Sequence, residues 1–285
     1  MRELVPWWTR IAVKLVLSRL PVAYALWRKL NLFAHGAMDQ ADYAVRVFQQ
    51  HFAQSGLAVG EGFVGLELGP GDSLASAVIA AAYGATHVHL VDAGAFATTD
   101  LAVYRQIAHH LLTRCMKPPN LDGVSDVDGL LTACRASYGT HGLASLRMIP
   151  TASVDFIWSH AVLEHIRRRE FLDFMRETRR ILKDEGVCSH EIDLRDHLGG
   201  ALNNMRIPSR WWEADWMARS GFYTNRLRSS EMIRAFESAG FSTGIVAMKR
   251  WQSMPTPRHA FADEFQGLDA EELLVQVFDV VLNPV

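Results

Sequence analysis

The sequence lacks any apolar run of the ~18–20 residues that a membrane-spanning helix needs. It also lacks paired cysteines: its three cysteines stand far apart with no CxxC motif, which argues against a disulfide framework or a zinc ribbon and fits a reducing compartment. Neither charge dominates, since 29 basic and 31 acidic residues give a formal net charge of −2. This balance does not favour a nucleic-acid partner. We therefore expect a cytoplasmic globular protein that binds no nucleic acid.

The first 33 residues differ in composition from the rest of the chain. Residues 7–33 are rich in Trp, Leu and Val, and Glu3 is the only acidic residue before Asp39. The basic residues of this stretch are Arg10, Lys14, Arg19, Arg28 and Lys29. Such a segment suits the inner face of a membrane, where basic side chains meet anionic headgroups while Trp and Leu enter the acyl boundary. A helical cap packed on the globular domain is the other interpretation, and the sequence leaves both open.

Beyond residue 60, strand-like and helical segments alternate, which predicts an α/β fold with a layered sheet. Apolar runs predict strands at residues 62–68, 87–91, 154–159, 187–194, 241–248 and 274–282. Apolar residues at helical spacing predict helices at residues 38–55, 74–83, 98–115, 130–138, 171–182 and 231–239. The first strand, turn, helix and strand form a unit of the kind that builds parallel sheets.

A glycine-rich turn (residues 67–71, Glu-Leu-Gly-Pro-Gly) follows the first predicted strand. Glycines there allow positive φ and the close approach of a ligand. A dinucleotide fingerprint would need a third glycine, but Leu74 stands at that position. Glu67 does not suit a pyrophosphate and suits a cationic ligand instead. Asp92 ends the second predicted strand, 21 positions after Gly71 (92 − 71), where a carboxylate can accept hydrogen bonds from both hydroxyls of a ribose.

Four segments, in the same order along the chain, resemble the motifs of class I S-adenosylmethionine (SAM)-dependent methyltransferases. Residues 66–71 resemble their motif I, and residues 91–92 their acidic motif II. Residues 154–166 (VDFIWSHAVLEHI) resemble their fourth-strand motif. Residues 180–186 resemble the turn before their fifth strand, with Asp-Glu in place of the usual Pro-Gly.

The resemblance implies a Rossmann-like sheet of seven strands with an antiparallel last strand, in which the two C-terminal runs supply strands six and seven. It implies an N-terminal helical extension at residues 1–60 and a SAM-dependent methyltransferase domain at residues 61–285. Two stretches exceed the minimal fold: an insert at about 98–138 and a substrate lid at about 196–230.

The resemblance also implies how SAM, the cofactor, is bound. The glycine turn would line its methionine and ribose end, Asp92 would hold the ribose hydroxyls, and Ala93 would lie near the adenine. Ser159 and His160 would contact the methionine part. The full set of expected cofactor-binding residues is Glu67, Leu68, Gly69, Pro70, Gly71, Asp92, Ala93, Ser159 and His160. The family's usual acidic residue after strand three is missing, since residues 143–146 (Leu-Ala-Ser-Leu) occupy the region where we expect it.

Four histidines are candidates for the catalytic general base that an alcohol nucleophile needs. His160 and His165 follow the strand predicted at residues 154–159, and His190 and His197 lie in and after the strand predicted at residues 187–194, at the sheet edge where substrates bind. A structural histidine bonded to backbone is the alternative for each. Carboxylates near His190 alternate away from it along the strand, so we expect no metal site.

Residues 196–228 combine aromatic, amide and arginine side chains, which suits a sugar or another polyhydroxyl ring. These side chains are Asn203, Asn204, Arg206, Arg210, Trp211, Trp212, Trp216, Tyr223 and Asn225. We therefore expect O-methylation of a hydroxylated small molecule, such as a sugar or a lipid-linked glycan. A quinone or isoprenoid lipid is an alternative acceptor, because residues 163–165 (Leu-Glu-His) resemble quinone-biosynthesis O-methyltransferases, although Ala161 replaces a Glu of their pattern. A non-catalytic SAM-binding homologue is a third reading, against which the intact glycine turn and Asp92 argue.

Overall fold

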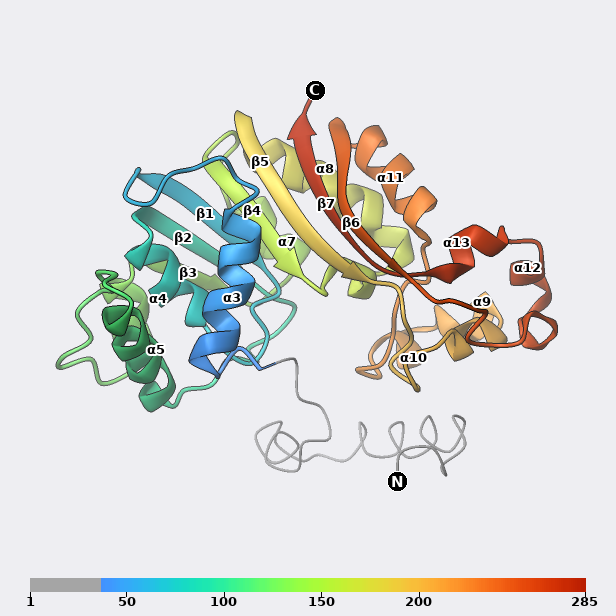
Figure 1. Ribbon diagram of the computed structural model, residues 1–285, viewed down its shortest axis with the longest axis horizontal. Coiled ribbons are helices and arrows are strands. Elements are labelled where there is room, and N and C mark those ends of the chain that lie inside the picture. The colour runs from blue at the N-terminus through green and yellow to red at the C-terminus, as the bar shows by residue number, and fades with distance from the viewer. Residues whose placement is uncertain (1–36) are drawn as a thin grey trace.

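The computed structural model describes residues 37–285 (Figure 1). The basic, Trp-rich stretch at residues 7–33 lies outside the described residues, so both interpretations of it stay predictions. Of the expected N-terminal extension, the structure describes the part that contains helix α3 (Ala41–Phe52), and the division at residue 60 also stays a prediction. Within residues 37–285, no helix has the length and apolar composition needed to cross a membrane.

Seven strands form one sheet in the order β3-β2-β1-β4-β5-β7-β6. Their bounds are β1 (Phe63–Leu68), β2 (Ala85–Val91), β3 (Ala136–Gly139), β4 (Val154–His160), β5 (Leu182–Asp193), β6 (Phe241–Arg250) and β7 (Val275–Pro284). The first five strands pair in parallel, and β7 runs antiparallel to both of its neighbours, β5 and β6. This arrangement confirms the predicted α/β, Rossmann-like sheet of seven strands with an antiparallel last strand.

Helices cover both faces of the sheet (Figure 1). One face carries α3, α4 (Ala75–Ala82) and α5 (Leu101–Thr113), and the other carries α7 (Leu143–Arg147), α8 (Phe171–Ile181) and α11 (Ser229–Ser238). Because side chains alternate along a strand, Trp158 of β4 enters the core on the α3 face and Ile157 the core on the other. The remaining helices are α6 (Val127–Ala133), α9 (Ser209–Trp212), α10 (Asp215–Ala218), α12 (Asp263–Gln266) and α13 (Ala270–Leu274), with 3₁₀ turns at Leu163–His165, Arg168–Glu170, Asn203–Arg206 and Arg258–Ala260.

Helix α3 packs along the central strands through its apolar face. Phe48 is fully buried on this face, and its ring meets that of Trp158 edge-on, with 5.3 Å between the ring centroids. The same packing brings polar residues of α3 to β5: Gln50 reaches Glu191, and His51 reaches Ser189.

Strand β3 differs from the sequence-based expectation. The helix predicted at residues 130–138 is wrong in its second half, because α6 ends at Ala133 and residues from Ala136 pair in parallel with β2. Residues 143–146 do follow strand three, as expected, and belong to helix α7. A strand of four residues shows no apolar alternation, so its pairing with β2 decides its structure rather than its local sequence.

Strand β6 forms one edge of the sheet, and its pairing with β7 is irregular. The register shifts between Ile245 and Ala247, which is the mark of a β-bulge. The strand ends in Lys249 and Arg250, both exposed.

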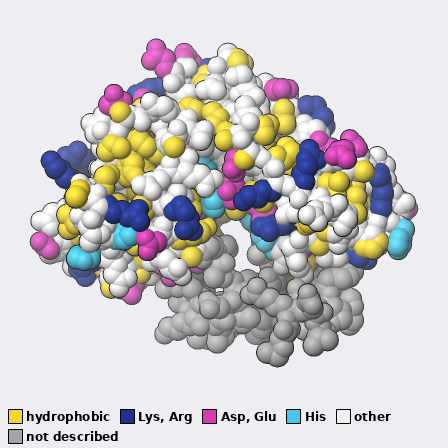
Figure 2. All heavy atoms as spheres, viewed as in Figure 1, with side chains coloured by type: hydrophobic (Ala, Val, Ile, Leu, Met, Phe, Trp, Pro, Cys, Tyr) yellow, Lys and Arg dark blue, Asp and Glu magenta, His cyan; other side chains and the backbone are white. Residues whose placement is uncertain are grey.

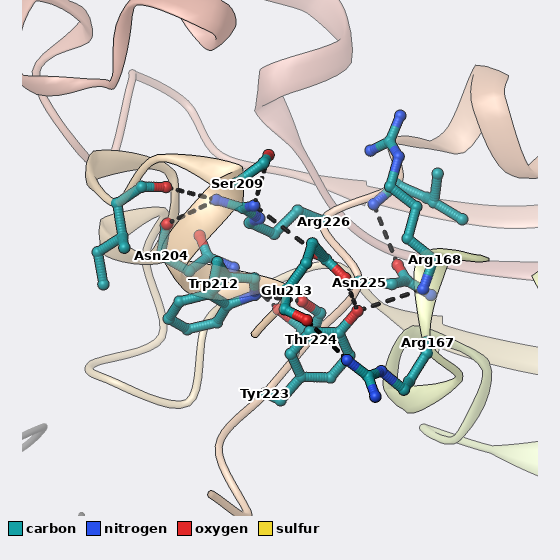
Figure 3. A network of polar contacts seen from close by, with 12 residues as sticks. Arg167, Arg168, Asn204, Ser209, Trp212, Glu213, Tyr223, Thr224, Asn225 and Arg226 are labelled. Atoms are coloured by element: carbon teal, nitrogen blue, oxygen red, sulfur yellow. Dashed lines mark hydrogen bonds and ion pairs between the residues drawn. The ribbon is translucent and has the colours of Figure 1, made fainter. Parts of the chain in front are cut away.

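The segment between β5 and α11 is held by two buried arginines. Arg226 donates through Nη1 to the carbonyl oxygen of Ile207 at 2.7 Å and through Nη2 to Ser209 Oγ at 2.8 Å, and its guanidinium lies over the ring of Trp212 (Figure 3). Burial lowers the pKa of Arg226 to about 10. Arg228 donates to the carbonyl oxygens of Leu194, Glu272 and Val275, so it joins the end of β5 to the start of β7.

Replacing Arg228 with Lys is expected to lower the free energy of unfolding by roughly 2–4 kcal/mol. One ammonium cannot reach all of the carbonyl oxygens that the guanidinium satisfies, and each buried group left unpaired costs about 1–3 kcal/mol. Urea denaturation followed by circular dichroism measures the change. Arg234→Lys on the exposed side of α11 is the control, and an equal effect of the two substitutions would contradict the anchoring role of Arg228.

Candidate functional site

The turn after β1 requires glycine at residue 69. Gly69 has φ +67° and Gly71 has φ +65°, in the left-handed region that favours glycine. A Cβ atom on Gly69 would lie 2.6 Å from Cγ2 of Val162, which belongs to the turn after β4. The backbone of the glycine turn and the turn after β4 are therefore in close contact, and any side chain at residue 69 would separate them.

Asp92 is held at the carboxyl end of β2 by two backbone amides. Its Oδ2 accepts a hydrogen bond from the Gly71 amide at 2.9 Å, and its Oδ1 accepts one from the Ala93 amide at 2.6 Å. A carboxylate oxygen can accept more than one hydrogen bond, so Asp92 has the acceptor chemistry that two ribose hydroxyls need.

The loop after β3 also contacts Asp92. The Asp92 amide donates to the carbonyl oxygen of Gly139, and the Gly142 amide donates to the carbonyl oxygen of Asp92, both at 2.8 Å. The ends of β1, β2 and β3 thus form one cradle around Asp92. Sequence reasoning missed the contribution of residues 139–142, because it predicted a helix at residues 130–138 and no strand there.

Glu67 lies under this cradle and is almost completely buried. Its Oε1 accepts hydrogen bonds from Ser76 Oγ at 2.9 Å and from Trp158 Nε1 at 3.3 Å, whereas its Oε2 is buried without a partner. Burial raises the pKa of Glu67 to about 8, against the opposing effect of the Ser76 and Trp158 hydrogen bonds. A carboxyl with one unsatisfied buried oxygen favours a positive charge nearby, so these residues fit SAM, whose sulfonium and amino groups are cationic.

His160 and Glu191 form a pair at the carboxyl ends of β4 and β5, on the α3 face of the sheet. The two residues are partners in the parallel register, and His160 Nε2 lies 3.3 Å from Glu191 Oε1. Burial lowers the pKa of His160, and Glu191 opposes this shift. Figure 2 shows acidic, basic and histidine side chains gathered in the middle of the face that carries α3.

Helix α3 adds three residues to this pair that sequence reasoning missed. Gln50 Nε2 donates to Glu191 Oε2 at 3.2 Å, and the ring centroids of His51 and Tyr43 lie 5.7 Å and 6.3 Å from that of His160. Burial lowers the pKa of His51 to about 3, so its imidazole is neutral. The amphipathic spacing of α3 predicts a buried face, but it does not indicate which strand that face contacts.

His190 belongs to the other face of the sheet. It is completely buried, its Nδ1 lies 2.7 Å from Ser159 Oγ, and burial lowers its pKa to about 3. The structure therefore separates His190 from His160, although the two residues lie on the neighbouring strands β5 and β4. His190 fixes the orientation of Ser159, an expected cofactor-binding residue.

His165 and His197 lie together at a third position. Their Nε2 atoms are 3.1 Å apart and their rings are nearly parallel, at 8°. His165 Nδ1 lies 2.8 Å from the carbonyl oxygen of Tyr223, so Nδ1 carries the proton and Nε2 accepts from His197. The pair joins the turn after β4 to the segment that begins at residue 196, and a role for either as a base stays a prediction.

Most of the expected sugar-binding side chains in residues 196–228 serve the packing of that segment. Asn204 donates to Thr224 Oγ1, Trp212 Nε1 donates to the carbonyl oxygen of Thr224, and Asn225 donates to the carbonyl oxygens of Leu163 and Ile166 (Figure 3). Trp211 remains 52% exposed, with the guanidinium of Arg210 over its ring.

No group of three or more His, Cys, Asp or Glu side chains among residues 37–285 is arranged to hold a metal ion.

A family described as "Methyltransferase domain" matches residues 120–189, which include β3, β4 and much of β5. No curated protein matches the sequence. Among solved structures, the YcgJ protein from Bacillus subtilis is 15% identical with a TM-score of 0.46, covering 86% of this chain and 99% of that one. A SAM-dependent methyltransferase from Mesorhizobium loti is 16% identical with a TM-score of 0.45, covering 87% and 99%. The CurJ carbon methyltransferase is 13% identical with a TM-score of 0.46, and this chain covers 58% of its length.

Replacing Asp92 with Ala is expected to weaken SAM binding at least tenfold, which corresponds to about 1.4 kcal/mol, because the ribose hydroxyls lose their acceptor. Calorimetric titration of the purified protein with SAM and with S-adenosylhomocysteine measures the affinity. Asp173→Ala on the exposed surface of α8 is the control. Equal affinity of the Asp92 variant and the wild type would refute the assigned position of the ribose.

Replacing Glu67 with Gln is expected to raise the free energy of unfolding relative to wild type, and this difference should grow as the pH rises. The pKa of Glu67 is about 8 in the folded protein against its ordinary 4.5, so folding favours the protonated form. The protonated Glu67 carboxyl therefore stabilises the folded protein fully below pH 4.5, and this stabilisation is lost as the pH rises through 8. The loss in the free energy of unfolding is at most about 4–5 kcal/mol. Gln cannot ionise and avoids that loss. Denaturation of wild type and Glu67→Gln at pH 5 and pH 8, without SAM, measures this difference in the free energy of unfolding. If that free energy changed with pH equally in the two proteins, the prediction would be wrong.

Proposed function

We propose that this chain transfers the methyl group of SAM to a hydroxyl oxygen of a small molecule. Its sheet order and its match to the methyltransferase-domain family support membership of the class I SAM-dependent methyltransferases. The observation that supports the proposed transfer best is the His160–Glu191 pair at the carboxyl ends of β4 and β5. These strand ends adjoin the glycine turn, which contacts the turn after β4 through Gly69 and Val162. A proton acceptor is thus next to the expected cofactor position.

Bound SAM supplies the activated methyl group, and the protein must bring an oxygen nucleophile into line with it and accept its proton. His160 suits proton acceptance because burial keeps its imidazole neutral. Glu191 would stabilise the imidazolium that forms when His160 takes the proton, and Gln50 holds the Glu191 carboxylate from the side of α3. The residues Glu67 to Gly71 together with Asp92, Ala93 and Ser159 would hold the cofactor.

The acceptor that we propose is a sugar or a lipid-linked glycan. The exposed ring of Trp211, with Arg210 beside it, offers a face on which a sugar ring can stack and a charge that can bind its hydroxyls or a phosphate. A lipid-linked acceptor would also give a reason for the basic, Trp-rich residues 7–33, through which we propose contact with the inner face of a membrane. An acceptor screen should therefore include free sugars, glycolipids and quinols.

His160→Gln and Glu191→Gln are each expected to lower kcat on a hydroxylated acceptor by about 10²–10⁴-fold, the usual contribution of a general base. The affinity of Glu191→Gln for SAM should change less than threefold. Release of S-adenosylhomocysteine measures turnover, and His259→Gln on the surface is the matched control. Full turnover in both variants would remove this pair from the mechanism. SAM binding without turnover on any member of the screen would favour a non-catalytic homologue.

A further inference from the structure

Glu191 faces a second carboxyl group across the sheet. In the antiparallel pairing of β5 with β7, Glu191 lies directly opposite Asp279. Directly opposite residues point to the same face, and this is the face that His51 and His160 share with Glu191. Two ionised carboxylates in this position repel each other, so the pair has a strong preference for holding one proton.

The hydrogen-bond donors around the pair decide which carboxyl holds that proton. Gln50 Nε2 donates to Glu191 Oε2 at 3.2 Å, and His160 Nε2 lies 3.3 Å from Glu191 Oε1, so each oxygen of Glu191 has a polar partner. On Asp279, Oδ1 is buried and has no hydrogen-bond partner among the described residues. A single proton held by the pair would therefore be on Asp279.

The charged groups around Asp279 agree with this assignment. Burial and the Glu191 carboxylate raise the pKa of Asp279, and Lys249 of β6 lowers it by a smaller effect. The other titratable or charged groups that act on Glu191 or His160 are His51 and Tyr43 of α3, Glu164 after β4, Asp193 of β5, Arg195 after it and Lys249 of β6. Asp193 is neutralised by Arg195, whose Nη2 lies 2.7 Å from its Oδ2.

We propose that Asp279 is a positioning residue for His160: it keeps a proton, donates it in a hydrogen bond to Glu191, and so holds the Glu191 carboxylate in contact with the imidazole. The proton stays on Asp279 in this hydrogen bond to Glu191. When His160 accepts the proton of the acceptor hydroxyl, the single negative charge of the Glu191–Asp279 pair balances the imidazolium. The catalytic consequence rests on the proposed function, whereas the shared proton does not.

The shared proton can be tested without an acceptor. In wild-type protein with ¹³C-labelled histidine, the His160 resonance is expected to show a second inflection at the pH where Asp279 ionises, because the field at the imidazole then changes. Asp279→Asn keeps a hydrogen-bond donor but cannot ionise, so its His160 resonance should lack that inflection. Asp173→Asn on the opposite side of the sheet should retain it. A wild-type profile without the second inflection, or the same inflection in Asp279→Asn, would overturn the proposal.

The positioning role is tested by comparing Asp279→Asn with Asp279→Leu, which has a similar volume and no donor. With an accepted acceptor, kcat of the Asn variant should stay within threefold of wild type, and kcat of the Leu variant should fall at least tenfold, with SAM affinity unchanged in both. An equal loss in both variants would show a merely structural role. If His160→Gln retained full turnover while the second inflection was present, the proposed base would fail and the shared proton would stand.

Discussion

The register in which β4 pairs with its two neighbours is the constraint on which the whole site depends. β4 lies between β1 and β5, and this pairing sets Trp158 beside Glu67 and His160 beside Glu191. A shift of one residue would move every side chain of β4 to the opposite face. Trp158 would then leave both Glu67 and the apolar face of α3, so the register is maintained by the core as much as by backbone hydrogen bonds.

Three carboxyl groups on this frame share one physical property. Glu67, Glu164 and Asp279 each have a buried oxygen without a hydrogen-bond partner, and burial raises the pKa of all three. The protein tolerates this because neutral carboxyl groups cost less to bury than ionised ones. None of the three groups is balanced by a fixed cation among the described residues. A positive charge brought by a cofactor or by an imidazolium can therefore be stabilised by ionisation of the nearby carboxyl group.

The sequence predicted those parts of the site that local residue pattern determines. The glycine turn and Asp92 could be identified because turn and strand end are contiguous, and positive φ at Gly69 and Gly71 demands glycine. The contacts of Gln50 and His51 with β5 could not, because 141 and 138 residues separate the partners and only packing brings them together. Strand β3 was missed for the same reason. In residues 196–228, composition suggested ligand binding, but Trp212 and Asn225 turned out to hold the segment's own backbone.

The bulged edge strand has a consequence for how copies of this chain behave toward one another. A flat, regular edge would offer its free amide and carbonyl groups to the same edge of another molecule, which is the first step of aggregation through sheets. In β6 the extra residue between Ile245 and Ala247 breaks that repeat, and the exposed ammonium of Lys249 opposes pairing with an identical strand. An irregularity in the pairing of two strands thus protects against unwanted self-association.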